Sequence, residues 1–321
     1  MQKIIIDTDP GIDDAIAILL ALSAKEKLEV LALTTVNGNV DVEKTTQNAF
    51  KILKIAGRED IPVYKGNAKP LMRENDHCEE YHGDDGLGNL NLEASSREPE
   101  EETATDFLIR KVREEKGEIT LVPIGPLTNI AEAVQKDPEF VNNVKELVIM
   151  GGAENGGNMG PHSEFNFWTD PEAAKIVFNA GFKNVTMVGL DATGYVYMDP
   201  TLRELLYLLD TPASRFIHKM TRAYADGHWA IDRKLGCQLC DVLTIAYLLD
   251  RNVAETVDAF VDIETSGLCD GASVVYRKSH YPDKKQNCKV AVKADTKKFF
   301  ELFFSYLFPD CIDEINAALK N

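Results

Sequence analysis

The sequence predicts an α/β fold in which a mostly parallel central sheet is flanked by helices, as in a Rossmann fold, with a helical elaboration. Strand-like and helix-like segments alternate from the first residues onward, which is the pattern of repeated β-α units. The first strand-like segment, residues 3–7, is an apolar run, as expected for a strand buried on both faces. Several helical segments also carry capping residues at their ends. We expect a single domain over residues 1–321.

The first half of the chain supplies the first β-α units. Asp41 is predicted to cap a helix, because its carboxylate can accept hydrogen bonds from the free N–H groups at a helix start, and Gly57 is predicted to end that helix. The polar, acidic segment 93–102 is expected to be a surface loop. The elements expected in this half are strands at 3–7, 28–35 and 119–124 and helices at 12–22, 41–56 and 103–115.

The second half of the chain continues the alternation and adds the helical elaboration. Pro171 stands in the first turn of an expected helix that Thr169 or Asp170 caps and that Gly181 ends. Residues 202–250 have a mainly helical pattern. The remaining expected elements are a helix at 128–136, strands at 147–150, 185–190, 259–265 and 288–292, and a C-terminal helix that begins at 299–307.

The charge balance excludes several classes of partner. The chain carries 35 basic and 52 acidic residues, a formal net charge of −17. Such a field repels nucleic acid phosphates and anionic lipid headgroups, so no nucleic acid or membrane partner is expected. No apolar run reaches the roughly 18 residues that span a bilayer, and residues 1–6 are too short for a signal peptide. Six cysteines are few for this length and are typical of reduced thiols. We therefore expect a cytoplasmic protein.

The first strand-to-helix junction holds four aspartates, Asp7, Asp9, Asp13 and Asp14. Open α/β sheets bind ligands beyond the carboxyl ends of their strands, so a site is expected here. Helix capping accounts for one or two of these carboxylates, but crowded like charges are costly without an offsetting cation. A hard divalent cation with oxygen ligands resolves this. Because adjacent helical residues do not share a face, one of Asp13 and Asp14 can bind metal while the other binds substrate.

The other junctions supply mainly neutral polar groups. Asn39 and Asn158 lie in loops that follow strands, and the Pro and Gly residues around Ile124 can turn a backbone carbonyl toward a cation. Glu164 and Asn166 are two residues apart, so an extended stretch would point both the same way, although the segment also fits an ordinary half-buried strand. The junctions contain no Lys or Arg, which phosphate sites normally need. The pattern favours a hydroxyl-rich, unphosphorylated ligand.

Cys237 and Cys240 have the C-x2-C spacing of zinc and redox sites. A structural zinc site would need two more ligands, and the sequence has no second pair. A thioredoxin-type redox role lacks its βαβ setting. Asp241 precedes an apolar helix, where it can cap the helix or return to the metal.

Taken together, these junctions resemble the inosine–uridine preferring nucleoside hydrolase family. The family's opening motif, D-x-D-x-G-x-D-D, stands at residues 7–14. The other matching segments are T-T-V-x-G-N at 34–39, H-G-x-x-G-x-G at 82–88, V-P-x-G-P-L-T-N at 122–129, M-G-G at 150–152, G-N at 157–158, E-F-N at 164–166 and D-P-E-A-A at 170–174. The resemblance implies the nucleoside hydrolase fold and calcium-dependent hydrolysis of the N-glycosidic bond of ribonucleosides.

The resemblance also implies a role for each matching residue. The calcium ligands would be Asp9, Asp14, Asp241 and the carbonyl oxygen of Ile124. Asp9 would also be the general base that acts on a calcium-bound water. The substrate groups would be Asp13 and Asn166 on the ribose 2′- and 3′-hydroxyls, with Asn39 nearby, and Asn158 and Glu164 on the 5′-hydroxyl. The family further implies a nucleoside as the small-molecule partner and a homo-oligomer, either a dimer or a tetramer.

The sequence departs from the family immediately before Asp241. Many members carry a histidine there as the acid for the leaving base, whereas this chain is similar to the branch with cysteine and has Cys240. A free thiol has a pKa of about 8.5, so it is protonated at neutral pH, but it is a weak hydrogen-bond donor. Cys240 and His82 are the candidates for a catalytic acid. Tyr224, His228 and Trp229 are further candidates for contact with the base, Trp229 by stacking.

Two other functions stay open at this point. The first strand and junction are similar to the D-x-D-x-T/V motif of haloacid dehalogenase-type magnesium phosphohydrolases, but Gly11 stands in the last position of that motif. A non-catalytic ribose- or calcium-binding protein would keep the asparagines and Glu164 but could lose the base, which Asp9 supplies here.

Overall fold

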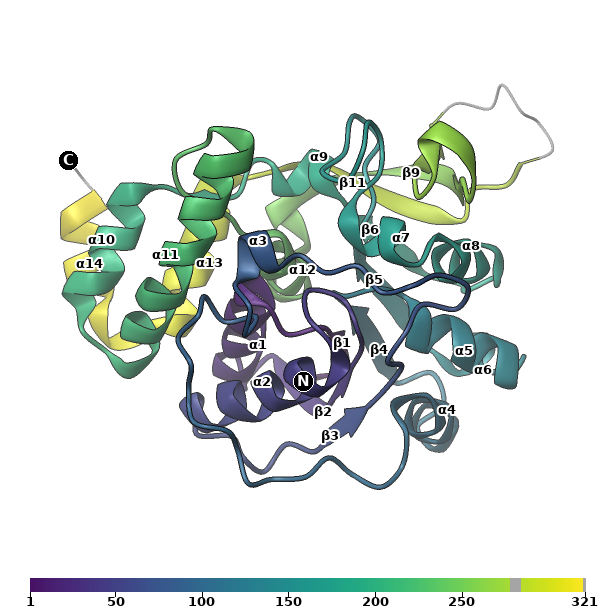
Figure 1. Ribbon diagram of the computed structural model, residues 1–321, viewed down its shortest axis with the longest axis horizontal. Coiled ribbons are helices and arrows are strands. Elements are labelled where there is room, and N and C mark those ends of the chain that lie inside the picture. The colour runs from purple at the N-terminus through teal and green to yellow at the C-terminus, as the bar shows by residue number, and fades with distance from the viewer. Residues whose placement is uncertain (278–283, 320–321) are drawn as a thin grey trace.

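The computed structural model describes residues 1–277 and 284–319, and a nine-stranded sheet runs through its centre (Figure 1). The strand order is β10-β9-β11-β6-β5-β4-β1-β2-β3. The pairs from β3 to β11 are parallel, whereas β9 pairs antiparallel with both β11 and β10. The predicted mostly parallel sheet is therefore confirmed. The strands are β1 (Gln2–Thr8), β2 (Leu28–Thr35), β3 (Val63–Lys65), β4 (Ile119–Pro123), β5 (Glu146–Met150), β6 (Val185–Val188), β9 (Ala254–Ile263), β10 (Ser273–Tyr276) and β11 (Cys288–Ala294).

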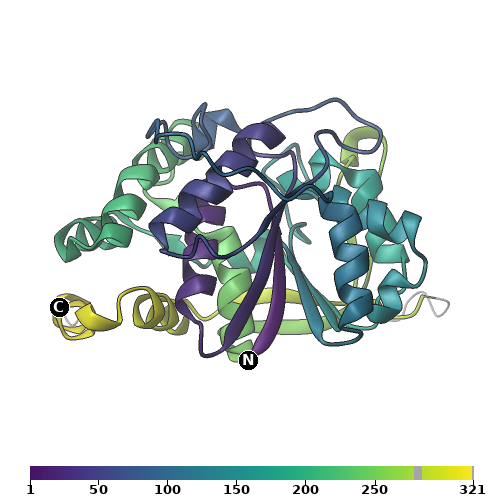
Figure 2. The ribbon, with the colours of Figure 1, turned by 90° about the horizontal axis from the view of Figure 1, so that it is seen from below.

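Helices lie on both sides of this sheet (Figure 2), because side chains along each strand alternate between its faces. Ile4 and Ile6 of β1 belong to one buried cluster, and Ile5 belongs to the other. The first cluster is built with α1 (Ile12–Ser23), α2 (Val42–Ile55), α10 (Pro200–Leu209), α11 (Pro212–Asp232), α12 (Cys240–Leu249), α13 (Thr296–Leu307) and α14 (Ile312–Leu319). The second is built with α4 (Ala104–Glu114), α5 (Thr128–Lys136), α6 (Phe140–Asn143), α7 (Phe165–Thr169) and α8 (Pro171–Asn179).

The helical elaboration predicted at 202–250 consists of α10, α11 and α12; α10 and α11 lie to one side of the sheet in Figure 1, whereas α12 lies near the centre and contacts α1. A two-stranded sheet, β7 (Tyr197–Met198) with β8 (Cys237–Gln238), joins the segments that flank α10 and α11. Short helices complete the structure: α3 (Glu79–His82), α9 (Leu190–Thr193), and the 3-10 turns Arg251–Val253, Gly267–Cys269 and Pro309–Cys311. Within the described residues, no helix is both long enough and apolar enough to cross a membrane.

The capping residues occupy the places that the sequence predicted. The Asp41 carboxylate accepts the Lys44 N–H at 3.0 Å, and Asp170, not Thr169, caps α8 by accepting the Ala173 N–H at 3.0 Å. These caps fix where the β-α loops end and where the helices begin. The segment 93–102 contains no helix or strand, as expected for a loop.

Several elements differ from the sequence-based expectation. β9 begins at Ala254 rather than at residue 259, and the short strand β3 and the edge strand β10 were not predicted. The segment 164–166 is not extended, because Glu164 caps the short helix α7. The strand predicted at 185–190 ends at Val188 and is followed directly by α9.

Candidate active site

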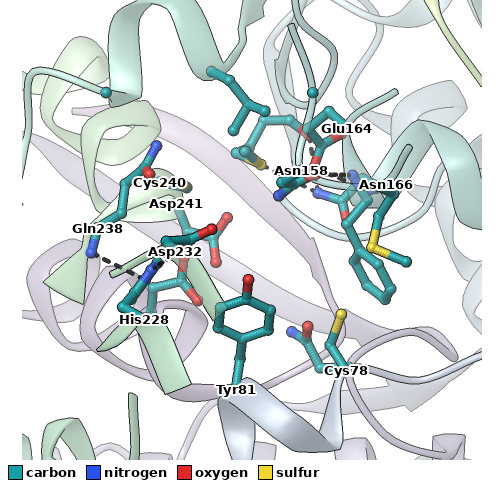
Figure 3. Close-up of a pocket in the computed structure, with 18 of the residues that line it drawn as sticks. Cys78, Tyr81, Asn158, Glu164, Asn166, His228, Asp232, Gln238, Cys240 and Asp241 are labelled. Carbon is teal, nitrogen blue, oxygen red and sulfur yellow. Dashed lines mark hydrogen bonds and ion pairs between the residues drawn. The ribbon is translucent and has the colours of Figure 1, made fainter. Parts of the chain in front are cut away.

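A cavity of about 300 Å³ lies at the carboxyl ends of the parallel strands (Figure 3). Segments that follow β1, β2, β4 and β5 line it, together with parts of α3, α11 and α12. This is where open α/β sheets bind their ligands. The predicted site residues that line the cavity are Asp13, Asn39, His82, Ile124, Asn158, Glu164, Asn166, His228, Cys240 and Asp241.

Three buried carboxylates come together beside the cavity. Asp13, Asp14 and Asp241 each offer an oxygen, and these oxygens lie within 4.8 Å of one another. Asp14 is held in place by the Thr8 hydroxyl at 2.6 Å and by the Asn39 side-chain amide at 3.0 Å. Burial raises the pKa of all three carboxyls, because their charged forms lose hydration. A divalent cation would offset that cost.

Asp9 lies close to this cluster and has one unpaired oxygen. Its Oδ2 accepts the Asn39 N–H at 2.8 Å, while its buried Oδ1 has no partner among the described residues. The chain wraps tightly around the carboxylate, because a Cβ at Gly38 or Gly125 would lie 1.9 or 2.4 Å from its oxygens. Burial, and then the charge of Asp14, raises the pKa of Asp9. An orphaned buried oxygen beside three carboxylates fits a hard cation.

The four predicted metal ligands therefore do not all lie equally close together. Asp14 and Asp241 are in the tight group, whose third member is Asp13, while Asp9 lies outside it. The Ile124 carbonyl lines the cavity and accepts a hydrogen bond from the Asn166 amide at 3.0 Å.

Glu164 is buried and anchored by backbone donors. Its carboxylate accepts the N–H groups of Gly152 at 2.9 Å, Asn166 at 3.0 Å and Phe167 at 3.3 Å. Burial raises the pKa of Glu164 to about 7, and these three hydrogen bonds oppose the rise. Because three donors hold it, the carboxylate keeps one orientation at the cavity wall.

Two asparagines line the cavity near Glu164. The Asn166 side-chain nitrogen donates to the Ile124 carbonyl and to the Met150 carbonyl at 3.2 Å. The Asn158 side-chain oxygen accepts the Phe165 N–H at 2.9 Å. Amides and a carboxylate on one wall provide the donors and acceptors that sugar hydroxyls need.

His82 lines the cavity as a neutral imidazole. Its Nδ1 accepts the N–H of Ile12, the first residue of α1, at 3.0 Å. Burial lowers the pKa of His82 to about 3. Because Nδ1 is an acceptor, the ring proton is on Nε2. His82 can therefore donate one hydrogen bond but carries no positive charge near neutral pH.

His228 and Cys240 both hydrogen bond within the protein. The His228 Nδ1 lies 2.9 Å from an Asp232 carboxylate oxygen, and its Nε2 accepts the Gln238 N–H at 3.4 Å, so both ring nitrogens are occupied. The Cys240 thiol donates to the Thr193 hydroxyl at 3.5 Å, and burial raises its pKa. His228 thus holds the segment that carries Cys240.

The model of the family described as inosine-uridine preferring nucleoside hydrolase matches residues 4–301. The chain belongs to this family. It is 41% identical over 320 residues to the inosine-uridine preferring nucleoside hydrolase of Leishmania major, which covers 95% of this chain and 97% of that protein. It is 37% identical over 315 residues to the probable uridine nucleosidase 2 of Arabidopsis thaliana, again over 95% and 97%. A solved plant nucleoside hydrolase superposes with a TM-score of 0.91 at 37% identity, over 95% of this chain and 98% of that one.

As a nucleoside hydrolase, the chain is an enzyme that hydrolyses the N-glycosidic bond of ribonucleosides. The resemblance stated from the motifs is confirmed, and so is the nucleoside hydrolase fold. The phosphohydrolase alternative receives no support from the family match.

Trp229, a predicted site residue of this nucleoside hydrolase, does not line the cavity. Its indole is 49% exposed, and the Arg233 guanidinium lies 5.8 Å from the ring centre. Further residues line the cavity that the sequence did not predict, among them Cys78, Tyr81, Asp232, Lys234 and Gln238. Tyr81 precedes the H-G motif, and Asp232 follows His228 by one helical turn, but neither signal is specific.

The metal-free nucleoside hydrolase is expected to be more stable at pH 6 than at pH 8. Burial raises the pKa of Asp13 and Glu164 to about 7, so near pH 6 the folded state holds protons that the unfolded state has released. These two carboxyls therefore lower the stability as the pH rises through 7, and the lowered pKa of His82 offsets only part of that change, because its imidazole gains a proton near pH 6.5 in the unfolded state alone. Calorimetry in EGTA should give a Tm about 5 °C or more higher at pH 6. Saturating calcium should reduce the difference, and a Tm that rises with pH in EGTA would contradict the prediction.

Proposed function

We propose that this nucleoside hydrolase depends on calcium and uses Asp9 as the base that activates the attacking water. The observation that carries the proposal is the unpaired, buried Oδ1 of Asp9 near three clustered carboxylates. The proposed ligands are Asp9, Asp14, Asp241 and the Ile124 carbonyl, all oxygen donors, and Ca²⁺ accepts six to eight such donors in flexible geometry. When bound, the cation would lower the pKa of water and anchor the ribose diol.

The remaining polar residues of the cavity are proposed to hold the ribose. Asp13 and Asn166 bind the 2′- and 3′-hydroxyls with Asn39 nearby, while Asn158 and Glu164 bind the 5′-hydroxyl. The carboxylates also stabilise the positive charge that grows on the ribosyl ring as the bond to the base lengthens. Glu164 suits this task because three backbone donors hold its orientation.

The proposed reaction breaks one bond and forms another. Water bonds through its oxygen to C1′ on the face opposite the base, and Asp9 takes its proton. The electron pair of the C1′–N bond goes to the departing base. Free base and ribose are the products.

Free ribose, measured after the protein is incubated with a nucleoside, tests the proposal. We expect ribose from at least one of inosine, adenosine, uridine and cytidine when calcium is present. A non-catalytic binder would release nothing from any of them. A phosphohydrolase would release only phosphate, and only from phosphorylated substrates.

Calcium removal is expected to abolish most of this activity. EGTA should lower ribose release by about 10²-fold or more, since both the water and the diol lose their cation. Added Ca²⁺ should restore the rate, and Mg²⁺ should restore it poorly because it prefers stricter octahedral geometry. Full activity after exhaustive chelation would refute the calcium requirement.

Cys240→Ala is expected to change turnover of inosine and of p-nitrophenyl riboside by similar, small factors. The thiol already donates to Thr193, and burial raises its pKa, so it is a poor acid. Cys237→Ala is the matched control, because the Cys237 thiol donates to the Thr221 carbonyl and does not line the cavity. General acids contribute about 10²–10⁴-fold, so such a loss on inosine alone would establish Cys240 as the acid.

We also propose that the enzyme is cytoplasmic and homo-oligomeric, a dimer or a tetramer. All six cysteines are free thiols, as is typical of a reducing compartment. Large apolar side chains are exposed at Leu208 of α10 and at Leu235 just after α11, and we propose that copies of the chain meet at this helical region. Light scattering on the purified protein tests the oligomeric state.

A further inference from the structure

The cavity contains one side chain of unexpected charge. Among the described residues that line it, Lys234 is the only lysine or arginine. The strand-to-helix junctions contain none, and the other ionisable groups on its wall are carboxylates, neutral imidazoles, phenols and thiols. A single positive charge in an otherwise neutral or acidic cavity is a candidate for contact with a ligand group that becomes negative during the reaction.

Lys234 follows the end of α11 and lines the cavity with an exposed side chain. Arg233 adopts the left-handed conformation (φ 57°, ψ 30°), and the Lys234 N–H bonds to the His228 carbonyl at 3.3 Å, which turns the chain sharply. Arg233 then extends the other way, where it donates to the Trp229 carbonyl at 3.1 Å and covers the indole. Of these two adjacent basic residues, Arg233 therefore lies outside the cavity and Lys234 lies along its wall.

The Lys234 ammonium is free to meet a ligand. In the described part of the chain it has neither an ion pair nor a hydrogen bond. Asp232, the nearest acid in sequence, is already bonded to His228. Burial lowers the pKa of His228 and the charge of Lys234 adds to that shift, whereas at Cys240 the same charge offsets part of the rise in pKa that burial causes, so the ammonium lies within electrostatic reach of that wall.

The same wall faces the departing base under the proposed function. Asn158, Glu164 and Asn166 stand on the opposite side of the cavity from Gln238 and Cys240 (Figure 3). If the first group holds the ribose, the base must lie toward the second.

Most donors on the base side are already occupied. The His228 ring is bonded at both nitrogens, and the Cys240 thiol donates to Thr193. The Tyr224 hydroxyl is bonded to Asp13. The His82 Nε2–H, the second N–H of the Gln238 amide and the Lys234 ammonium remain, and of these only the ammonium is positively charged.

We propose that Lys234 is a catalytic residue that hydrogen bonds to the leaving base and stabilises the electron pair the base takes from C1′. This inference rests on the proposed function. The C1′–N bond breaks with both electrons on the base, Asp9 holds the proton from water, and the ammonium keeps its own protons while it pairs with the anionic base. The base then takes a proton from solvent on release.

Substitution of Lys234 tests the inference with two leaving groups. Lys234→Met should lower kcat for inosine by about 10- to 100-fold, since preorganised donors on developing charge contribute effects of this order or larger. For p-nitrophenyl riboside the fall should be less than about threefold, because nitrophenolate is a weak base that needs little stabilisation. Lys234→Arg should recover most of the lost rate on inosine.

Arg233→Met is the matched control, since it removes the same charge one residue away, and it should act like wild type on both substrates. Wild-type kcat on inosine in Lys234→Met, or equal losses on both substrates, would overturn the role of Lys234. Equal losses in Arg233→Met would show that net charge alone matters and would overturn it too. Wild-type protein that releases no ribose from any nucleoside would instead refute the proposed function itself.

Discussion

Asp9→Asn is expected to lower kcat for inosine by about 10²–10⁴-fold, with KM within a few-fold of wild type. A general base acts only as the water attacks, so its loss appears in kcat more than in binding. The change keeps the shape of the side chain and an oxygen that can accept the Asn39 N–H, which Oδ2 accepts at 2.8 Å. What it removes is the charge and the basicity of the unpaired oxygen.

Two measurements separate a chemical role of Asp9 from a structural one. Asp7→Asn is the matched control, because Asp7 is a buried aspartate two residues before Asp9 but has no part in the proposed metal site or reaction. Its Oδ1 accepts the Asn129 amide at 2.8 Å, a bond that asparagine can keep. Calcium affinity of both variants, measured by titration calorimetry, shows whether the metal is still bound. Wild-type turnover in Asp9→Asn would remove Asp9 from the mechanism.

The acidic site at the first strand-to-helix junction could be predicted from sequence, because its aspartates all lie within the continuous segment 7–14. A buried strand that ends in aspartates and runs into a helix must place Asp9, Asp13 and Asp14 close together at the sheet edge. The helix caps could be predicted for the same reason, since Asp41 and Asp170 act on N–H groups only three residues ahead.

The cavity wall that faces the base could be predicted only in part: Cys240 and His228 were candidates, whereas Lys234 and Gln238 are placed there by tertiary contacts. Trp229 lies on an exposed part of α11, whereas Lys234 follows the left-handed turn at Arg233 and lines the cavity. No local pattern marks that turn. The helical conformation of the segment at Glu164 was also not predicted. The Glu164 carboxylate accepts hydrogen bonds from three backbone N–H groups there, and one of them belongs to the distant Gly152.

The edge of the sheet was also less predictable than its centre. The first half of β9, which begins at Ala254, alternates polar and apolar residues and is only partly buried. It therefore lacks the continuous apolar run that marked β1. β10 pairs with β9 alone in the described structure, so its position depends on a partner rather than on its own sequence.

Inosine is expected to be hydrolysed with a kcat/KM about 10³-fold higher than inosine 5′-monophosphate at pH 8. The proposed site for the 5′-hydroxyl contains the buried Glu164 carboxylate, which three backbone N–H groups prevent from turning away. Two like unit charges 4 Å apart repel by about 4 kcal/mol at an effective dielectric constant of 20, which is roughly three powers of ten.

The preference for inosine over its 5′-monophosphate should also depend on pH, and the raised pKa of Glu164 sets the direction of that dependence. Burial raises the pKa of Glu164 to about 7, so the carboxyl gains a proton as the pH falls from 8 to 6, and the repulsion weakens. The phosphate itself loses charge near pH 6, in the same direction. The ratio of the two kcat/KM values should therefore shrink at pH 6, and Glu164→Gln should reduce it at pH 8 by removing the fixed charge. A fixed carboxylate must repel a phosphate dianion that it contacts. Comparable kcat/KM for inosine and its 5′-monophosphate at pH 8 would therefore show that Glu164 does not face the 5′ position.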